Sequence, residues 1–239
     1  MAQQLDLQEQ EQVDALKAFW TQYGNLITWT LTIVLALYAA YNGANWLQRS
    51  KALQASTMYG DVELAAHAGD ADRAAHIFAD MKAKTVVSFL PRAIAPVPTY
   101  TQQAGLMAAR VQTEKGQAAN AMASLQWVVD NGNAENAAVA RLRLAGLLAD
   151  AKKPDEALHQ LDQISLPAFG ALVADRRGDI LLAKGDKAGA VAAYAKAFDA
   201  LPVEQQYRLV IEAKLTTLGA APAVSAASAA AAAASGGAQ

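Results

Sequence analysis

Few side chains in this sequence could carry out acid–base or metal chemistry, and they are widely spaced. The three histidines form no HxxxH or HExxH pair, the helical spacing that places two imidazoles beside one metal ion; they are His67, His76 and His159. Cysteine is absent, which excludes thiol catalysis, disulfides and cysteine-bound metals. No glycine-rich phosphate loop or nucleophile elbow occurs either. We therefore predict no enzyme activity, no catalytic, metal or cofactor-binding residues and no cofactor.

Paired charged side chains are the remaining candidates for a site. The carboxylate pairs fall where the sequence predicts turns between helices, and short acidic residues there cap helices; they are Asp70 with Asp72 and Asp155 with Glu156. The arginine pairs are typical of solvated helix faces but could also line a groove that recognises acidic partner segments; they are Arg141 with Arg143 and Arg176 with Arg177. The formal net charge of −2 gives no reason to expect nucleic acid as a partner.

The segment that must position everything else is an uncharged stretch, residues 18–48. Its apolar centre, residues 26–41, is flanked by aromatic residues on both sides, Trp20 and Tyr23 before it and Tyr41 and Trp46 at its end. About 20 helical residues cross the ~30 Å hydrocarbon core of a bilayer, and aromatic rings prefer its two interfaces. The pattern predicts one transmembrane helix.

Two other interpretations fit this stretch less well. A buried core helix could be equally apolar, but it would seldom be so long or carry two aromatic girdles. A cleavable signal peptide needs a basic leading region and a cleavage site of small residues. The preceding residues instead carry four carboxylates against one cation, Lys17. We therefore expect a retained anchor.

The rest of the chain repeats a helical pattern. The clearest unit spans residues 171–202, with Gly178, Ala190, Tyr194 and Pro202 at the offsets of a tetratricopeptide repeat. Small residues let two antiparallel helices approach, the aromatic ring fills the wedge between them, and proline ends the second helix. Gly185 and the Asp186 that follows it mark the turn.

Weaker copies of this unit lie upstream. Their small and wedge residues are Ala157 with Leu161, Ala121 with Leu125, and Ala74 with Phe78. The longest interval contains a proline-rich insert or loop, residues 85–99. We count four helix-turn-helix units, followed by an amphipathic helix over residues 203–218 that caps the stack.

These patterns predict an all-α fold, a single N-terminal transmembrane helix followed by a tetratricopeptide-like helical solenoid with a C-terminal capping helix. The predicted parts are an N-terminal cytoplasmic segment (1–17), the transmembrane anchor (18–48), the repeat domain (49–218) and a disordered Ala/Ser-rich tail (219–239).

The opening run LDLQEQEQVDALKAFWTQYGN, the anchor after it, and the repeats with Gly69 and Gly185 at their turns resemble the YfgM-type ancillary subunits of the SecYEG translocon. The resemblance covers residues 5–218. It implies a non-enzymatic bacterial inner-membrane protein, single-pass, with a cytoplasmic N-terminus and periplasmic repeats. The implied partners are the translocon, periplasmic chaperones and newly exported chains, with no nucleic acid and no small-molecule substrate. One feature opposes this orientation, because Arg49 and Lys51 directly follow the anchor.

Repeat geometry predicts which residues contact a partner, because the first helix of each unit lines the concave face. The predicted residues are Gln103, Leu106, Arg110, Leu142, Gly146, Asp175 and Asp179. In the anchor, a row of small residues could pack against another membrane helix; it consists of Ala36, Ala40 and Ala44. The alternatives are an envelope scaffold for cell-division or cell-wall machinery, a cytoplasmic-facing tetratricopeptide regulator, and a hydrolase or transferase with a repeat domain, which no residue supports.

Overall fold

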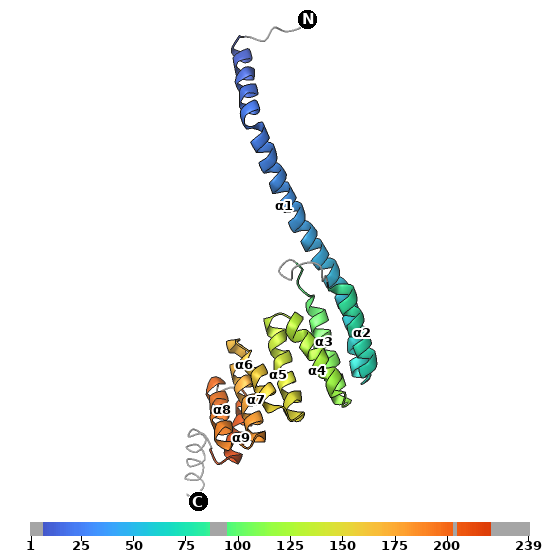
Figure 1. Ribbon diagram of the computed structural model, residues 1–239, viewed down its shortest axis with the longest axis vertical. Helices are drawn as coiled ribbons and strands as arrows, with labels where there is room; N and C mark the ends of the chain where they lie inside the picture. The colour runs from blue at the N-terminus through green and yellow to red at the C-terminus, as the bar shows by residue number, and fades with distance from the viewer. Residues whose placement is uncertain (1–6, 87–94, 203–204, 221–239) are drawn as a thin grey trace, which may run out of the picture.

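The computed structural model describes residues 7–86, 95–202 and 205–220, and these contain helices and no strand. The predicted all-α fold class is confirmed. The elements are α1 (Leu7–His67), α2 (Ala71–Thr85), α3 (Thr99–Glu114), α4 (Ala118–Asn131), α5 (Ala134–Asp150), α6 (Pro154–Asp162), the 3-10 helix η1 (Pro167–Phe169), α7 (Gly170–Ala183), α8 (Lys187–Ala200) and α9 (Tyr207–Thr217). Figure 1 shows α1 projecting from a stack formed by the shorter helices.

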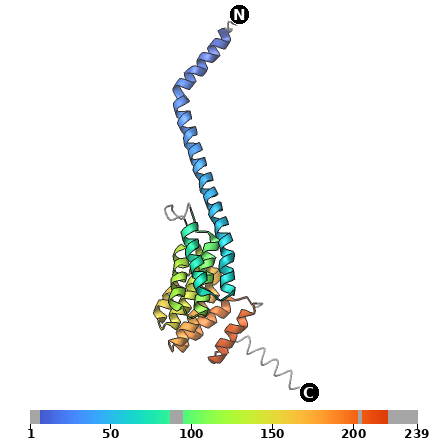
Figure 2. The same cartoon turned by 90° about the vertical axis from the view of Figure 1, so that its right-hand side faces the viewer.

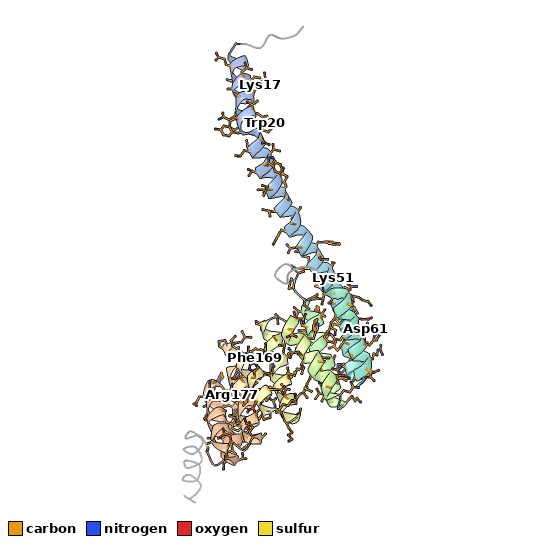
Figure 3. The ribbon with its side chains drawn as sticks, in the orientation of Figure 1. Lys17, Trp20, Lys51, Asp61, Phe169 and Arg177 are labelled. Atoms are coloured by element: carbon orange, nitrogen blue, oxygen red, sulfur yellow. The ribbon has the colours of Figure 1, made fainter. Side chains whose placement is uncertain are left out.

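Helix α1 contains the predicted anchor and continues beyond it without a break. Its 61 residues extend about 90 Å at 1.5 Å per residue. The large apolar side chains of the anchor are exposed, as lipid-facing side chains must be. Within the described chain α1 is the one helix long and apolar enough to cross a membrane. Figure 3 places Trp20 towards its outer end and Lys51 where it meets the repeats.

The limits predicted at residues 17 and 48 therefore lie inside one helix, and they remain predictions as domain boundaries. The last turns of α1 belong to the first repeat, because Ala55, Val62 and Ala65 are fully buried against α2 and α3. Figure 2, turned by 90°, also shows α1 running directly into the stack. No flexible linker separates the anchor from the solenoid.

Four helix pairs make up the stack, in agreement with the predicted count: the end of α1 with α2, α3 with α4, α5 with α6, and α7 with α8. The predicted wedge residue of every pair is at most 2% exposed, and the small residue one turn before it is fully buried. The wedge residues are Phe78, Leu125, Leu161 and Tyr194. Each unit thus contributes one large side chain to a core cluster between neighbouring helices. Phe78 lies in the first cluster, Leu125 and Leu161 in the middle one, and Tyr194 in the last.

Every pair turns through one residue with positive φ. Three of these are glycines, Gly69, Gly116 and Gly185, with φ between 66° and 85°. At the last of these turns the Asp186 carboxylate accepts a hydrogen bond from the amide of Gly189 at 2.8 Å, which confirms the predicted cap. The third pair departs from the pattern, because Lys152 takes the same position with φ 62°.

Replacing Lys152 by glycine should stabilise the protein. A residue with a side chain costs about 1–2 kcal/mol in the left-handed region, and glycine avoids this strain. Part of the resulting stabilisation is lost, because glycine has more conformational freedom in the unfolded chain. We expect Lys152→Gly to raise the free energy of unfolding by about 0.5–1 kcal/mol, measured by urea denaturation. The control is Lys187→Gly, at a helical position, which should lower it; a destabilised Lys152→Gly protein would contradict the argument.

The last helix, α9, closes the stack through a cluster of charged and phenolic side chains that we call the cap cluster: Asp175, Asp179, Tyr194, Tyr207 and Lys214. Lys214 Nζ lies 2.7 Å from Asp175 Oδ1 and 2.7 Å from Asp179 Oδ1. The Tyr207 hydroxyl donates to Asp175 at 2.5 Å, and the Tyr194 hydroxyl donates to Asp179 at 2.8 Å. Figure 1 shows α9 beside α7 and α8 at the C-terminal end.

The predicted cap helix is therefore present, although its outer surface is less polar than a cap requires, since Leu209 is 66% and Val210 47% exposed. Two predictions fall largely outside the described residues: the proline-rich insert, because 87–94 are not described, and the Ala/Ser-rich tail, because 221–239 are not.

Candidate partner-binding groove

A continuous groove follows the first helices of the last three repeats. It consists of three adjoining hollows of about 260, 420 and 290 Å³. The first adjoins α1 and is lined by Tyr59, Gln103, Leu106, Met107, Arg110 and Arg143. The second shares Arg110 and Arg143 with the first, and shares Gly146, Asp150 and Arg176 with the third. Because the hollows have side chains in common, they form one surface, which we call the concave groove.

A row of arginines runs along the concave groove. Arg110, Arg143 and Arg176 are separated by two intervals of 33 residues, so each occupies the same place in α3, α5 and α7. Arg143 extends towards the preceding repeat, where its Nη1 donates to the carbonyl of Leu106 at 3.0 Å. Arg176 extends likewise, since its Nη1 is 3.7 Å from the place a Cβ on Gly146 would occupy.

The electrostatic surroundings of the three arginines differ. Arg110 Nε pairs with Glu114 at 2.8 Å on a well-exposed part of α3. Arg176 Nη1 lies 3.8 Å from Asp179. No ion pair joins Arg143 to a carboxylate in the part of the chain that the structure describes. Burial and the neighbouring charge of Arg110 lower the pKa of Arg143.

The structure places most of the predicted partner-binding residues on this one surface. The residues that line the concave groove are Gln103, Leu106, Arg110, Gly146 and Asp179. A Cβ at Gly146 would be in ordinary van der Waals contact with the Arg176 guanidinium. Their role in partner binding stays a prediction.

Two predicted residues lie elsewhere. Leu142 is half-buried against the core of the middle repeats. Asp175 is 5% exposed and belongs to the cap cluster, where Lys214 and Tyr207 bind its carboxylate. Because α9 covers this end of α7, a partner cannot reach Asp175 while the cap is in place.

Sequence reasoning missed Tyr59 and did not single out Arg143 from its pair. Tyr59 lies on α1, whereas the predicted partner-binding residues come only from the first helices of the three later repeats, α3, α5 and α7. The signal for Arg143 was available: its 33-residue spacing from Arg110 and Arg176 matches the repeat period, whereas Arg141 and Arg177 do not continue the series.

Neither the row of small residues in the anchor nor the three histidines form a site in the described part of the structure. Ala36, Ala40 and Ala44 succeed one another along one side of α1, and their packing against a second membrane helix stays a prediction. His67, His76 and His159 are exposed and lie on three different helices, α1, α2 and α6. Within the described residues no three acidic or histidine side chains are grouped to hold a metal ion.

Comparison with known proteins agrees with this architecture. Residues 17–220 match the model of the tetratricopeptide repeat-like domain family. A protein of Escherichia coli strain K12 named ancillary SecYEG translocon subunit is 32% identical over 189 residues, which cover 78% of this chain and 85% of that protein. A protein of the same name from Neisseria gonorrhoeae is 26% identical over 213 residues, covering 89% of this chain and 98% of that protein.

Both relatives align over most of their length. The match to the family model starts at residue 17, so it includes the anchor-bearing part of α1 as well as the repeats. Repeats of this type and the relatives' name together point to a non-catalytic role in protein interaction. With one apolar N-terminal helix, a four-unit solenoid and these relatives, the chain belongs to the family of ancillary SecYEG translocon subunits, whose tetratricopeptide repeat-like domain it carries.

Proposed function

We propose that the protein is a non-enzymatic adaptor of the bacterial inner membrane. Helix α1 anchors it beside the protein-export translocon, and the concave groove presents a periplasmic surface to chaperones or newly exported chains. The observation that carries this proposal is the concave groove itself, an open surface formed by the same face of three successive repeats. Such surfaces are where stacked helical repeats bind extended partners.

The unbroken course of α1 supports a position close to the translocon. Between the end of the uncharged stretch at Gln48 and the first fully buried repeat residue, Ala55, the helix rises only about 10 Å. Because no flexible linker intervenes, the solenoid stays close to the membrane surface. A chain leaving a membrane channel would then meet the concave groove before it diffused away.

The proposed orientation places the N-terminus in the cytoplasm. Arg49 and Lys51 count against it, but Lys51 has a structural use, since its Nζ donates to the Lys84 carbonyl at the end of α2 at 2.7 Å. The positive-inside rule is also weak for long translocated domains. The native chain lacks cysteine, which makes a labelling test direct. Ser165 lies between repeats and Gln12 near the start of α1, and both are exposed.

Intact spheroplasts carrying Ser165→Cys should react with a membrane-impermeant maleimide, and those carrying Gln12→Cys should react only after lysis. The reverse pattern would place the repeats in the cytoplasm, overturn the export role and favour the cytoplasmic regulator that the charges beside the anchor suggest. Denatured, lysed samples of both variants control for the intrinsic reactivity of each cysteine.

Charge reversal at Arg110 should weaken retention of the partner without unfolding the protein. Arg110 is well exposed, and among the described residues it forms an ion pair with Glu114 alone, a type of pair worth less than about 1 kcal/mol. We expect Arg110→Glu to lower co-purification of periplasmic partners severalfold with an unchanged thermal midpoint, while SecYEG is retained through the anchor. Arg73→Glu on α2, outside the groove, is the matched control. Asp179 is unsuitable, because its reversal would also disrupt the cap cluster.

Equal retention by both variants would show that the concave groove does not hold the partner. The proteins that co-purify also separate this proposal from its rival, since peptidoglycan enzymes in place of SecYEG would indicate an envelope scaffold.

A further inference from the structure

One end of the concave groove differs from the rest in its charge. In the hollow beside α1, which we call the Tyr59 hollow, the described lining contains two arginines and no carboxylate. Farther along, Asp150 and Asp179 accompany Arg176, and Lys152 joins them, so that end is close to neutral. The excess of cationic over acidic lining residues in the concave groove is therefore largest between α1, α3 and α5.

Arg143 is exposed and lines the Tyr59 hollow, where most of its donors are open to solvent or to a ligand. Its guanidinium has five N–H donors, and the described hydrogen bonds use one of them, to the Leu106 carbonyl. Arg110 stands close enough for its charge to oppose that of Arg143. Two like charges in a hollow of about 260 Å³ repel each other, and an anion between them would remove that repulsion.

The remaining lining matches a carboxylate carried on an apolar stem. Gln103 offers an amide and Tyr59 a phenol, both able to donate to an oxygen, while Leu106 and Met107 supply apolar contact. The acidic groups nearby are Glu63, whose charge adds to the effect of burial in raising the pKa of Tyr59, and Glu114, which pairs with Arg110. Neither lines the Tyr59 hollow, so its centre remains available to a carboxylate from outside.

We propose that the Tyr59 hollow is a carboxylate-binding subsite, in which Arg143 and Arg110 bind an acidic side chain of an extended partner segment. Gln103 and Tyr59 orient the carboxylate, and the segment continues over Gly146 into the rest of the groove. An acidic side chain, in preference to a chain terminus, is the expected source, because the groove extends beyond the hollow and accommodates a segment that passes through it. This inference rests on the proposed function, since it specifies the chemistry of the partner that the groove holds.

The test uses the full chain in detergent micelles and a short fluorescent peptide of alternating glutamate and leucine. The peptide is acetylated and amidated, so that side-chain carboxylates are its only charges. Its glutamine counterpart should bind about tenfold more weakly, measured by fluorescence anisotropy. The salt concentration is 0.15 M, at which the Debye length is about 8 Å and long-range electrostatic attraction is suppressed. Equal binding of the two peptides would overturn the proposal.

Two variants locate the binding. Arg143→Gln should weaken binding of the glutamate peptide about tenfold, whereas Arg73→Gln, which changes the net charge equally outside the groove, should leave it within about twofold. Gln103→Glu places a carboxylate of the protein itself in the Tyr59 hollow and should also weaken binding, without removing either arginine. Equal effects of the two arginine variants, or no effect of Gln103→Glu, would overturn the assignment.

A glutamine peptide with a free C-terminal carboxylate distinguishes the source of the anion. If it binds as tightly as the glutamate peptide, the subsite recognises chain termini and the assignment to side chains is wrong. Failure of this inference is separable from failure of the proposed function. A protein that retains SecYEG and periplasmic partners but ignores the glutamate peptide would overturn the inference alone.

Discussion

Replacing Tyr194 by alanine should lower the free energy of unfolding by about 3–5 kcal/mol, the usual cost of deleting a large buried aromatic side chain. Tyr194 is 1% exposed and fills the wedge between α7 and α8, in the pair that also supports α9. Its loss would leave a cavity and remove the hydroxyl that donates to Asp179. Urea denaturation followed by circular dichroism measures the effect. Tyr100→Ala is the control, because that tyrosine is 43% exposed and should cost far less.

A double substitution tests the reason for this cost. A Cβ on Gly178 would overlap the Tyr194 ring, so Gly178→Ala alone should destabilise the protein by about 1–3 kcal/mol through overpacking. The preceding repeat has Ala145 and Leu161 at these two places, both buried. In a Tyr194→Leu background Gly178→Ala should therefore be nearly neutral. If its cost were the same in both backgrounds, the overlap with the ring would not be its cause.

The sequence predicts the solenoid well because its core repeats with the chain. Over the last three units the small and wedge residues recur at intervals of 33 and 36 residues, so the buried place of Tyr194 also identifies Leu161 and Leu125. Turns are similarly local, since a glycine with positive φ and an aspartate cap need only neighbouring residues. This local signal is missing at Lys152, because the residue at that turn is not glycine. Only its position in the repeat indicates that its φ is positive.

Two features could not be predicted in this way. Hydrophobicity marks where lipid contact ends, near Gln48, but the helix continues to His67 and turns at Gly69. Gly60-Asp61 has the same two residues as the turns at Gly69 and Gly185 but lies inside α1, so residue type alone does not locate the turn. The anchor and first repeat therefore share α1, and Tyr59 became part of the groove. Asp175 was placed in the groove because the period puts it there. Its actual partner, Lys214, is 39 residues away in a helix that has no counterpart in the other repeats.

Removing the cation at the centre of the cap cluster should release α9. Lys214→Met keeps most of the apolar stem but leaves two carboxylates facing each other, one of them on the buried Asp175. Breaking a fully buried pair costs about 3–5 kcal/mol; because Lys214 retains 30% exposure, we expect about 2 kcal/mol. Hydrogen exchange should show lost protection in α9 and the end of α7, with α3 to α5 unchanged. Lys196→Met on α8, outside the cluster, is the control.

Alkaline pH provides an independent measure of the same cluster. Burial raises the pKa of Tyr207 to about 12, with the hydrogen bond to Asp175 adding to the effect. Burial alone would lower the pKa of Lys214, but its hydrogen bonds to Asp175 and Asp179 raise it overall. Between about pH 10 and 12 the unfolded chain loses protons that the folded protein keeps, so stability is constant below about pH 10 and falls above it. In Lys214→Met this alkaline loss should become shallower, because the lysine that keeps its proton in the folded protein above its ordinary pKa is gone. Tyr207 and Tyr194, whose pKa values burial raises, still contribute to the loss that remains. An unchanged alkaline limb in the variant would show that the cap cluster does not couple proton binding to folding.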